Sequence, residues 1–256
     1  FLAFEPGGLT TVGARTGIGK TWFVLKCALH TYIKEHTVLL GSMEMSKEDL
    51  AHRLACLYLK IEPMRATEGD ITDEEMQSYE DLIKKFRTNT TRKLFLAGQD
   101  IMGSIDIFEA MVSTLKPKIA IADAFYLIEE EEGGDEWRTI QHMTKRYKNI
   151  AKKYNTHVIL TAQMDATAAS AKKSTMDKVR HAKRITQDSD NFIVLSQTSQ
   201  QQKGKMIDML VLKARKGKAN MACHFNWNFE TMDLSELQAF VLEQDDPSEF
   251  GLGKKK

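Results

Sequence analysis

Cysteine, net charge and long apolar runs are all scarce in this sequence. Its 256 residues include only three cysteines, which are widely spaced and form no Cys-x-x-Cys pair. This argues against a disulfide framework or a zinc site and fits a reducing cytoplasm. No apolar run approaches the roughly 18 residues of a membrane-spanning helix, so we expect no membrane partner. The net charge of +1 indicates no overall attraction to nucleic acid.

The rest of the composition is that of an ordinary globular protein. Hydrophobic residues make up 42% and charged residues 28%, which excludes a mainly disordered or fibrous chain. The chain begins at Phe1, and we expect it to be a trimmed or ordered part of something longer. We find no internal repeat and no linker-like block. We therefore expect one domain over residues 1–256, with a flexible tail at 244–256.

Predicted strands and helices alternate through the first two-thirds of the chain. This pattern predicts an α/β fold with a central, mostly parallel sheet flanked by helices, and ligands at the carboxyl ends of its strands. Residues 61–71 read as a polar connection, and three later strands are expected to be antiparallel. The expected strands are 9–13, 37–42, 93–97, 118–123, 157–162, 191–196, 206–213 and 221–228, and the expected helices are 21–34, 46–60, 73–86, 104–116 and 136–154.

A phosphate-binding loop follows the first strand and precedes the first helix. Backbone N–H groups in such a loop surround a polyphosphate, and the helix N-terminus favours its negative charge. Lys20 would offset charge on the β- and γ-phosphates, and the Thr21 hydroxyl would ligate Mg²⁺. The strict motif has Gly where Ala14 stands, and we expect Gly13 and Gly17 to keep the loop flexible. The predicted ATP-binding residues are Ala14, Arg15, Thr16, Gly17, Ile18, Gly19, Lys20 and Thr21.

Two acids at other strand ends complete the predicted chemistry. Asp123 ends an apolar strand, where a carboxylate can hold Mg²⁺ beside the loop. Many nucleotide hydrolases carry a catalytic Glu directly after this Asp, but Ala124 stands there. Glu44, at the end of the second strand, is the alternative base. It would lie near the loop if the second strand neighbours the first.

These residues also carry a family resemblance. Residues 13–21 (Gly-Ala-Arg-Thr-Gly-Ile-Gly-Lys-Thr) with 42–45 (Ser-Met-Glu-Met) resemble the ATPase domain of DnaB-like replicative helicases, ring-forming motors with a RecA-like P-loop core. The resemblance assigns Gln163 to γ-phosphate sensing. Residues 185–190 (Ile-Thr-Gln-Asp-Ser-Asp) resemble the family segment that borders its DNA-binding loop. Residues 213–217 (Lys-Ala-Arg-Lys-Gly) imply that Lys213 and Arg215 reach the neighbouring subunit's ATP site.

The resemblance extends over nearly the whole chain and carries further expectations. It implies ATP and Mg²⁺ as substrate and cofactor, a hexameric ring in the full-length form, and unwinding of DNA with 5′–3′ polarity. It also implies primase and helicase-loader partners, and the cytoplasm of a bacterium or a phage-infected cell. The family's amino-terminal domain and linker helix are not found in these 256 residues, so assembly by this chain alone is a separate question.

Two charged segments bear on DNA binding. Residues 129–136 hold six acids and no base, which is a poor DNA contact. Residues 172–184 hold six bases against the single acid Asp177, with no aromatic residue in 165–186 for base stacking. A basic loop of this kind favours sequence-independent contacts with the backbone of single-stranded DNA. The predicted DNA-binding residues are Lys172, Lys173, Lys178, Arg180, Lys183 and Arg184.

Two other functions use a similar core. A RecA-like recombinase would coat DNA as an open filament and exchange strands without unwinding them. A KaiC-like regulatory ATPase would act on protein partners, without stimulation by single-stranded DNA.

Overall fold

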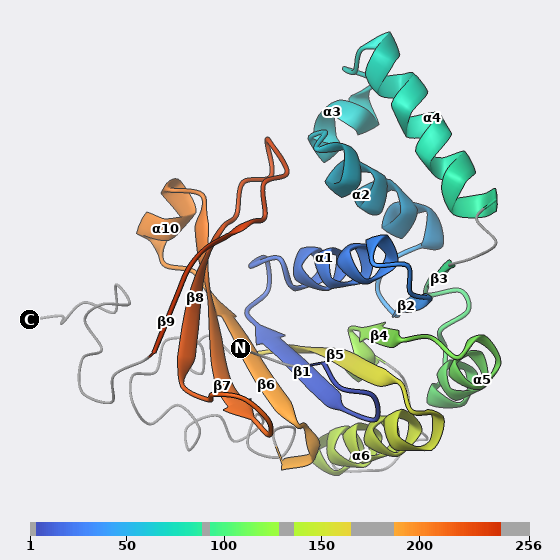
Figure 1. Cartoon of the computed structure of the whole chain (residues 1–256), viewed down its shortest axis with the longest axis vertical. Helices are drawn as coiled ribbons and strands as arrows, with labels where there is room; N and C mark the ends of the chain where they lie inside the picture. The colour runs from blue at the N-terminus through green and yellow to red at the C-terminus, as the bar shows by residue number, and fades with distance from the viewer. Residues whose placement is uncertain (1–3, 89–92, 128–135, 165–186, 242–256) are drawn as a thin grey trace, which may run out of the picture.

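A single nine-stranded sheet forms the centre of the fold. A computed structural model describes residues 4–88, 93–127, 136–164 and 187–241 (Figure 1). The strand order is β3-β2-β4-β5-β1-β6-β7-β8-β9. Strands β1 to β6 run parallel, and β7, β8 and β9 add to β6 as antiparallel neighbours. The antiparallel prediction is confirmed for the strands at 206–213 and 221–228, but it was wrong for the strand at 191–196, because β6 pairs in parallel with β1. The strands are β1 (Leu9–Ala14), β2 (Val38–Ser42), β3 (Leu94–Ala97), β4 (Ile119–Asp123), β5 (His157–Gln163), β6 (Asn191–Ser196), β7 (Met206–Ala214), β8 (Met221–Asn226) and β9 (Glu236–Val241).

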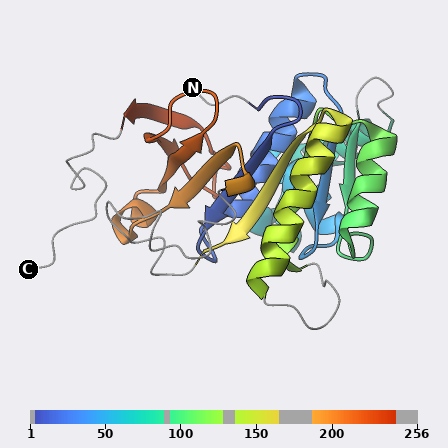
Figure 2. The same cartoon turned by 90° about the horizontal axis from the view of Figure 1, so that it is seen from below.

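Helices cover both faces of the parallel part of the sheet. Helices α1 (Lys20–Ile33) and α2 (Lys47–Leu59) lie over one face, and α5 (Ile105–Leu115) and α6 (Glu136–Tyr154) over the other (Figure 2). All residues of β1, β2 and β4 are therefore buried, which explains why these strands are nearly continuous apolar runs.

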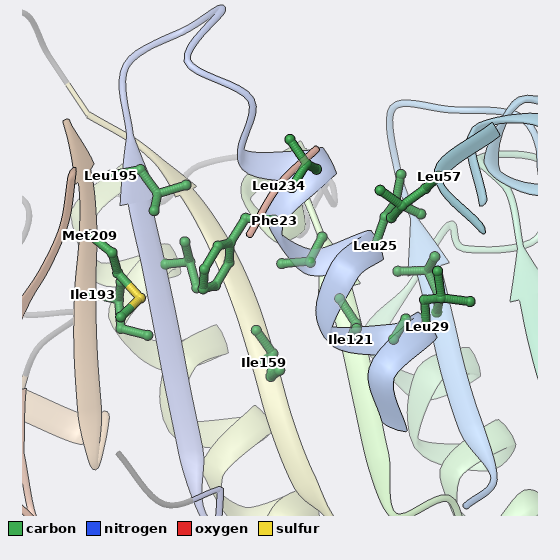
Figure 3. Close-up of a cluster of buried hydrophobic side chains, with 14 of the residues drawn as sticks. Phe23, Leu25, Leu29, Leu57, Ile121, Ile159, Ile193, Leu195, Met209 and Leu234 are labelled. Carbon is green, nitrogen blue, oxygen red and sulfur yellow. The ribbon is translucent and has the colours of Figure 1, made fainter. Parts of the chain in front are cut away.

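The larger hydrophobic core joins α1 to the middle of the sheet. Phe23 and Leu25 of α1 pack in one cluster with Ile121, Ile159 and Ile193, which come from β4, β5 and β6 (Figure 3). Apolar side chains at these positions fix α1 across the parallel strands. Because α1 begins at Lys20, this packing also fixes the start of the helix at the carboxyl edge of the sheet.

A small helical unit projects from the α1 face. It consists of α2, α3 (Pro63–Glu68) and α4 (Asp73–Thr88), which pack on one another at the upper right of Figure 1. Helix α2 begins where the Ser46 hydroxyl accepts a hydrogen bond from the Asp49 backbone N–H at 3.0 Å, as its capping pattern predicts.

The structure also contains elements that the sequence analysis missed. The prediction of a polar connection at 61–71 was wrong in part, because this segment contains α3. Pro63 stands at the start of this helix, where the backbone N–H that proline lacks would have no partner within the helix. The 3-10 turn η1 (Phe125–Leu127), helix α10 (Ser199–Lys203) and β9 were not predicted. Among the described residues, no helix is long and apolar enough to cross a membrane.

Candidate nucleotide site

Four parallel strands bring their carboxyl ends together at one edge of the sheet. Strands β2, β4, β5 and β1 are consecutive neighbours, and Ser42 pairs with Asp123 while Gln163 pairs with Ala14. This is the edge at which open α/β sheets bind ligands. The phosphate loop, Asp123, Glu44 and Gln163 all follow or end these strands, so the structure brings together the predicted nucleotide-binding residues.

The phosphate loop has the backbone that its glycines allow. Gly17 and Gly19 have positive φ angles of 79° and 99°, which side chains with a Cβ rarely adopt. Helix α1 starts directly after Gly19, and no side chain caps it. The first N–H groups of α1 therefore donate no bond to a capping side chain and point toward the loop as donors. Arg15, Thr16 and Gly17 are exposed. The loop thus offers backbone donors and a positive helix end to an anion.

Gly13 acts differently from the prediction. It lies inside β1 rather than in the loop, and a Cβ placed on it would lie 2.5 Å from the Met164 sulfur. Close packing, not loop flexibility, therefore requires this glycine. Ala14 is also a buried strand residue, and its carbonyl accepts a 3.4 Å hydrogen bond from Lys20 Nζ.

Trp227, beyond β8, supports the phosphate loop from its far side. Its indole Nε1–H donates to the Ile18 carbonyl at 3.0 Å, and a Cβ on Gly19 would lie 3.0 Å from the ring. Trp227 is buried and makes an edge contact with Phe229. The loop backbone is therefore held by a residue that is distant in the sequence.

Thr21 and Asp123 form the donor set expected for Mg²⁺. The Thr21 hydroxyl donates to Asp123 Oδ2 at 2.9 Å, and the Thr161 hydroxyl donates to Oδ1 at 2.7 Å. A hydroxyl and one carboxylate beside a phosphate loop suit Mg²⁺, which keeps waters and phosphate oxygens as its other ligands. The described residues contain no cluster of three or more His, Cys, Asp or Glu side chains that would indicate another metal.

Burial governs the charges at this edge. It raises the pKa of Asp123, and the hydrogen bonds from Thr161 and Thr21 offset this only in part. Burial likewise lowers the pKa of Lys20, against the attraction of Asp123 and Glu44. Asp123 is 1% exposed, and each of its carboxylate oxygens accepts from a neutral hydroxyl group. A divalent cation here would supply the positive charge that this carboxylate lacks.

Glu44 reaches the site by a different route from the one predicted. Strand β2 does not neighbour β1, because β4 and β5 lie between them. Instead, the Met43 N–H donates to the Asp123 carbonyl at 3.1 Å, and the Ser42 hydroxyl accepts from the N–H groups of Glu44 and Met45. This turn places an exposed Glu44 close enough to Lys20 and Asp123 for its charge to act on both.

Gln163 lies between Asp123, the predicted metal-binding acid, and the phosphate loop, and Tyr126 contacts it. Gln163 is exposed at the end of β5, the strand that separates β4 from β1. The Tyr126 hydroxyl donates to Gln163 Oε1 at 3.4 Å. Burial raises the pKa of Tyr126 to about 12, with added effects from Glu44 and Asp123. Tyr126 is thus a neutral hydrogen-bond donor beside the predicted γ-phosphate sensor.

Arg215 and Lys213 lie at the opposite, amino edge of the sheet. Because β7 is antiparallel to β6, its last residue, Ala214, pairs with the first residue of β6, Asn191. At about 3.3 Å per residue, the six residues of β1 put roughly 17 Å between this edge and the phosphate loop. An arginine side chain cannot cover that distance, so Arg215 does not reach the loop of its own chain.

Residues 2–235 match the family described as the DnaB-like helicase C terminal domain. The chain belongs to this family. A probable replicative DNA helicase of Trieres chinensis is 26% identical over 202 residues, which cover 75% of this chain and 44% of that protein. The replicative DNA helicase DnaC of Bacillus subtilis (strain 168) is 23% identical over 228 residues, covering 84% and 49%. The chain therefore spans less than half the length of these relatives.

Solved structures share the fold of this family member. One, described as an ATPase domain, superimposes with a TM-score of 0.77 at 20% identity, covering 91% of this chain and 86% of that one. A DnaB-like replicative helicase, described with its interactions with primase, gives 0.78 at 20% identity, covering 92% and 58%. These likenesses confirm the predicted RecA-like fold.

The predicted DNA-binding residues lie outside the described part of the chain. Lys172, Lys173, Lys178, Arg180, Lys183 and Arg184 belong to residues 165–186, and most of the acidic run belongs to 128–135. Their roles stay predictions.

Three residues of this helicase-family site were missed from sequence. Thr161 had a usable signal, because it is a polar residue inside an apolar strand and shares a strand face with Gln163. Tyr126 had a weak signal, because it lies two residues after Ala124, the position at which many nucleotide hydrolases carry a catalytic Glu. Trp227 had no local signal, since only the sheet order brings it to the loop.

Proposed function

We propose that this chain is the motor domain of a replicative DNA helicase, which hydrolyses ATP to move along single-stranded DNA and unwind the duplex. Membership in the DnaB-like helicase C-terminal domain family supports a helicase over the recombinase and the regulatory ATPase. The observation that supports the proposal most directly is that four side chains lie together at one edge of the sheet: Lys20, Thr21, Asp123 and Glu44. These are the parts that phosphoryl transfer to water needs.

Each side chain has a distinct task in this proposal. The N–H groups at the start of α1 bind the phosphates, and Lys20 offsets negative charge between the β- and γ-positions. Thr21 and Asp123 hold Mg²⁺, which neutralises developing charge when bound. Glu44 orients the attacking water and accepts its proton. Gln163, with its Tyr126 donor, responds to the presence of the γ-phosphate.

The site is completed by a second subunit. Arg215 lies at the wrong edge to serve its own phosphate loop, and it is 69% exposed. A planar guanidinium can bridge phosphate oxygens, whereas Lys213 contributes a point charge. We propose a hexameric ring in which the amino edge of one chain lies against the carboxyl edge of the next, as a head-to-tail interface allows.

DNA contact is assigned to the basic segment at 172–184. This segment joins β5, which ends at the proposed γ-phosphate sensor Gln163, to β6. Contacts to phosphates rather than bases suit a motor that must pass over every sequence. We propose 5′–3′ movement, action with primase and a helicase loader, and location in the cytoplasm. A solved relative is described with primase, which supports that partner.

The deciding experiment uses the protein with its full native sequence, ATP and Mg²⁺. We expect single-stranded DNA to stimulate hydrolysis, and forked DNA to be unwound when its 5′ tail is long enough to enter the ring. Hydrolysis without stimulation would instead support the regulatory ATPase. Strand exchange without unwinding would support the recombinase. Unwinding only from a 3′ tail would reverse the proposed polarity.

A further inference from the structure

Asp190 lies where β1 and β6 meet at the amino edge of the sheet. Its N–H donates to the Leu9 carbonyl at 2.8 Å, and its Oδ2 accepts the Leu9 N–H at 2.8 Å. Both its backbone and its carboxylate are thus fixed to the first residue of β1. The side chain is only 13% exposed. A carboxylate held in this way has one position rather than several rotamers.

A buried lysine fixes the same carboxylate from α6. Lys148 Nζ donates to Asp190 Oδ2 and to the Gly7 carbonyl, and the Lys148 side chain is 11% exposed. Moving two charges out of water costs free energy that offsets much of their mutual attraction. A buried ion pair of this kind is therefore weak evidence that it serves stability alone. What the pair does provide is a carboxylate whose second oxygen is held in a fixed direction.

That second oxygen binds Arg215. Arg215 Nη1 donates to Asp190 Oδ1 at 2.9 Å, and the Arg215 N–H donates to the Asp190 carbonyl at 2.9 Å. Asp190 therefore holds both the base and the tip of this side chain. The contact uses one of the five N–H donors of the guanidinium, so the others are left for a phosphate.

The neighbouring cation shows that this arrangement is specific to Arg215. Lys216 is equally exposed, at 70%, and its ion-pair partner Glu5 is itself 46% exposed. Such a surface pair holds its partners weakly because both side chains remain solvated. Of the two adjacent cations, Arg215 is the one held by a carboxylate that β1 and α6 fix in place.

We propose that Asp190 is the positioning residue for Arg215, holding its guanidinium where it meets the phosphate bound by the next subunit. This inference rests on the proposed trans role of Arg215. Asp190 does not touch the nucleotide; it acts through the direction that it gives to the arginine. Through Asp190, contacts with β1 and α6 thus fix the direction of an arginine that acts in a neighbouring chain.

The test uses Asp190→Asn in the protein with its full native sequence. We expect ATP binding to be retained and turnover to fall about 10²-fold, the scale of a catalytic group misplaced by about 1 Å. Assemblies mixed with Lys20→Ala subunits should regain hydrolysis, because an intact loop then meets a held arginine. Assemblies mixed with Arg215→Ala subunits should not regain it, because every arginine is missing or displaced.

Other mixing patterns would overturn the inference. Normal turnover of Asp190→Asn, or no recovery with Lys20→Ala, would mean that Asp190 serves the general structure only. If Arg215→Ala and Lys20→Ala subunits also fail to complement each other, the trans role itself fails. Arg215→Ala subunits are expected to recover activity with Lys20→Ala subunits. If they do, but Asp190→Asn subunits do not recover with Lys20→Ala subunits, the trans role stands and only the inference about Asp190 fails.

Two further variants guard against a folding defect. Asp190→Asn leaves Lys148 buried without its charge partner, so Lys148→Met with Asp190→Asn removes both charges together. This double variant should recover hydrolysis when mixed with Lys20→Ala subunits but not when mixed with Arg215→Ala subunits. Normal turnover by the double variant alone would contradict the inference. Lys216→Ala is the matched control, with an unchanged rate expected because its surface ion pair holds no part of the site.

Discussion

Asp123 and Asp190 are both largely buried aspartates at strand ends, yet their carboxyl groups respond in opposite ways. Burial raises the pKa of Asp123, and only hydroxyl groups and a more distant Lys20 oppose this effect. Burial also acts on Asp190, but the hydrogen bonds from Lys148, Arg215 and the Leu9 N–H, together with the charge of Lys148, lower the pKa of Asp190. The first carboxylate is short of positive charge, and the second has two cations.

This difference separates the two edges of the sheet by function. In our account, the carboxyl edge receives a metal ion and phosphates. The amino edge is arranged to hold a cation and present it outward. One strand length lies between them, so in our account a complete catalytic site needs the carboxyl edge of one chain and the amino edge of another. The predictions below test this division, from the largest expected effect to the smallest.

The two edges should fail in different ways when their main cation is removed. Arg215→Ala should bind ATP normally and hydrolyse it roughly 10³–10⁵-fold more slowly, because a trans arginine acts on the transition state. Lys20→Ala should lose nucleotide binding as well, since Lys20 faces the ground-state phosphates. Binding of a labelled ATP analogue and steady-state turnover distinguish the two. Lys26→Ala, an exposed lysine on α1, is the control.

If Arg215→Ala weakens ATP binding as much as Lys20→Ala does, the two edges do not have separate tasks. Full activity of Arg215→Ala would remove it from the reaction altogether.

Glu44→Gln should separate binding from turnover within the carboxyl edge. The amide keeps the shape of the side chain but cannot accept a proton, so turnover should fall about 10²–10⁴-fold while ATP binding persists. Glu48→Gln, an exposed acid on the next helix with a side-chain exposure of 77%, should leave the rate unchanged. Near-normal hydrolysis by Glu44→Gln would move the base elsewhere, with the acidic run at 129–136 as the next candidate.

Acid should weaken the amino edge first, through His157. Its Nδ1–H donates to the Glu5 carbonyl at 2.8 Å and its Nε2 accepts from the Thr10 hydroxyl at 2.9 Å, a set of bonds that suits neutral imidazole. Burial lowers the pKa of His157 to about 4 from 6.5. The unfolded chain therefore takes up the proton first as the pH falls below 6.5. Stability is then lost progressively down to about pH 4, roughly 3 kcal/mol in all.

Thermal or urea unfolding between pH 7.5 and 5 measures this effect. About 2 kcal/mol should be lost over that interval through His157, and His157→Gln should reduce the pH dependence by that amount. His30→Gln, an exposed histidine on α1, should not change it. An unchanged slope in His157→Gln would show that His157 is not the proton-sensitive group of this edge.

The basic segment joins the two edges and should show the smallest effect per residue. Replacing Lys183 and Arg184 with Ala should weaken binding to single-stranded DNA of every sequence tested. It should also reduce the slope of log affinity against log salt by about 0.7 per lost phosphate contact. A double variant of two exposed lysines on other elements, Lys26 and Lys152, is the matched control. Unchanged DNA affinity would mean that the segment is solvated surface.

Local patterns in the sequence were sufficient to locate the parallel strands from β1 to β5 and the phosphate loop, although the parallel direction of β6 was missed. Buried parallel strands are continuous apolar runs, and the phosphate loop has a strand before it and a helix after it, so both leave a signal over few residues. The order of the strands leaves no such signal. This is why Glu44 was expected beside β1, although the Ser42 turn brings it to the site through β4.

Long-range partners account for most of what was missed. Trp227 supports the loop from beyond β8, and Asp190 joins Leu9, Lys148 and Arg215 from three separate elements. Each of these contacts depends on the sheet order and not on the residues nearby in sequence. Gly13 illustrates the same limit, because its need for close packing comes from Met164 on the neighbouring strand's extension.

The central claim is that the two edges of different subunits make one site, and subunit mixing tests it most directly. Arg215→Ala and Lys20→Ala proteins of full native sequence are combined, assembly is verified by their mass in solution, and ATP hydrolysis is measured. Each protein alone should be inactive. An equal mixture should regain activity at about a quarter of the interfaces, where an intact loop meets an intact arginine in a head-to-tail ring. No recovery in a verified mixed assembly would contradict the account.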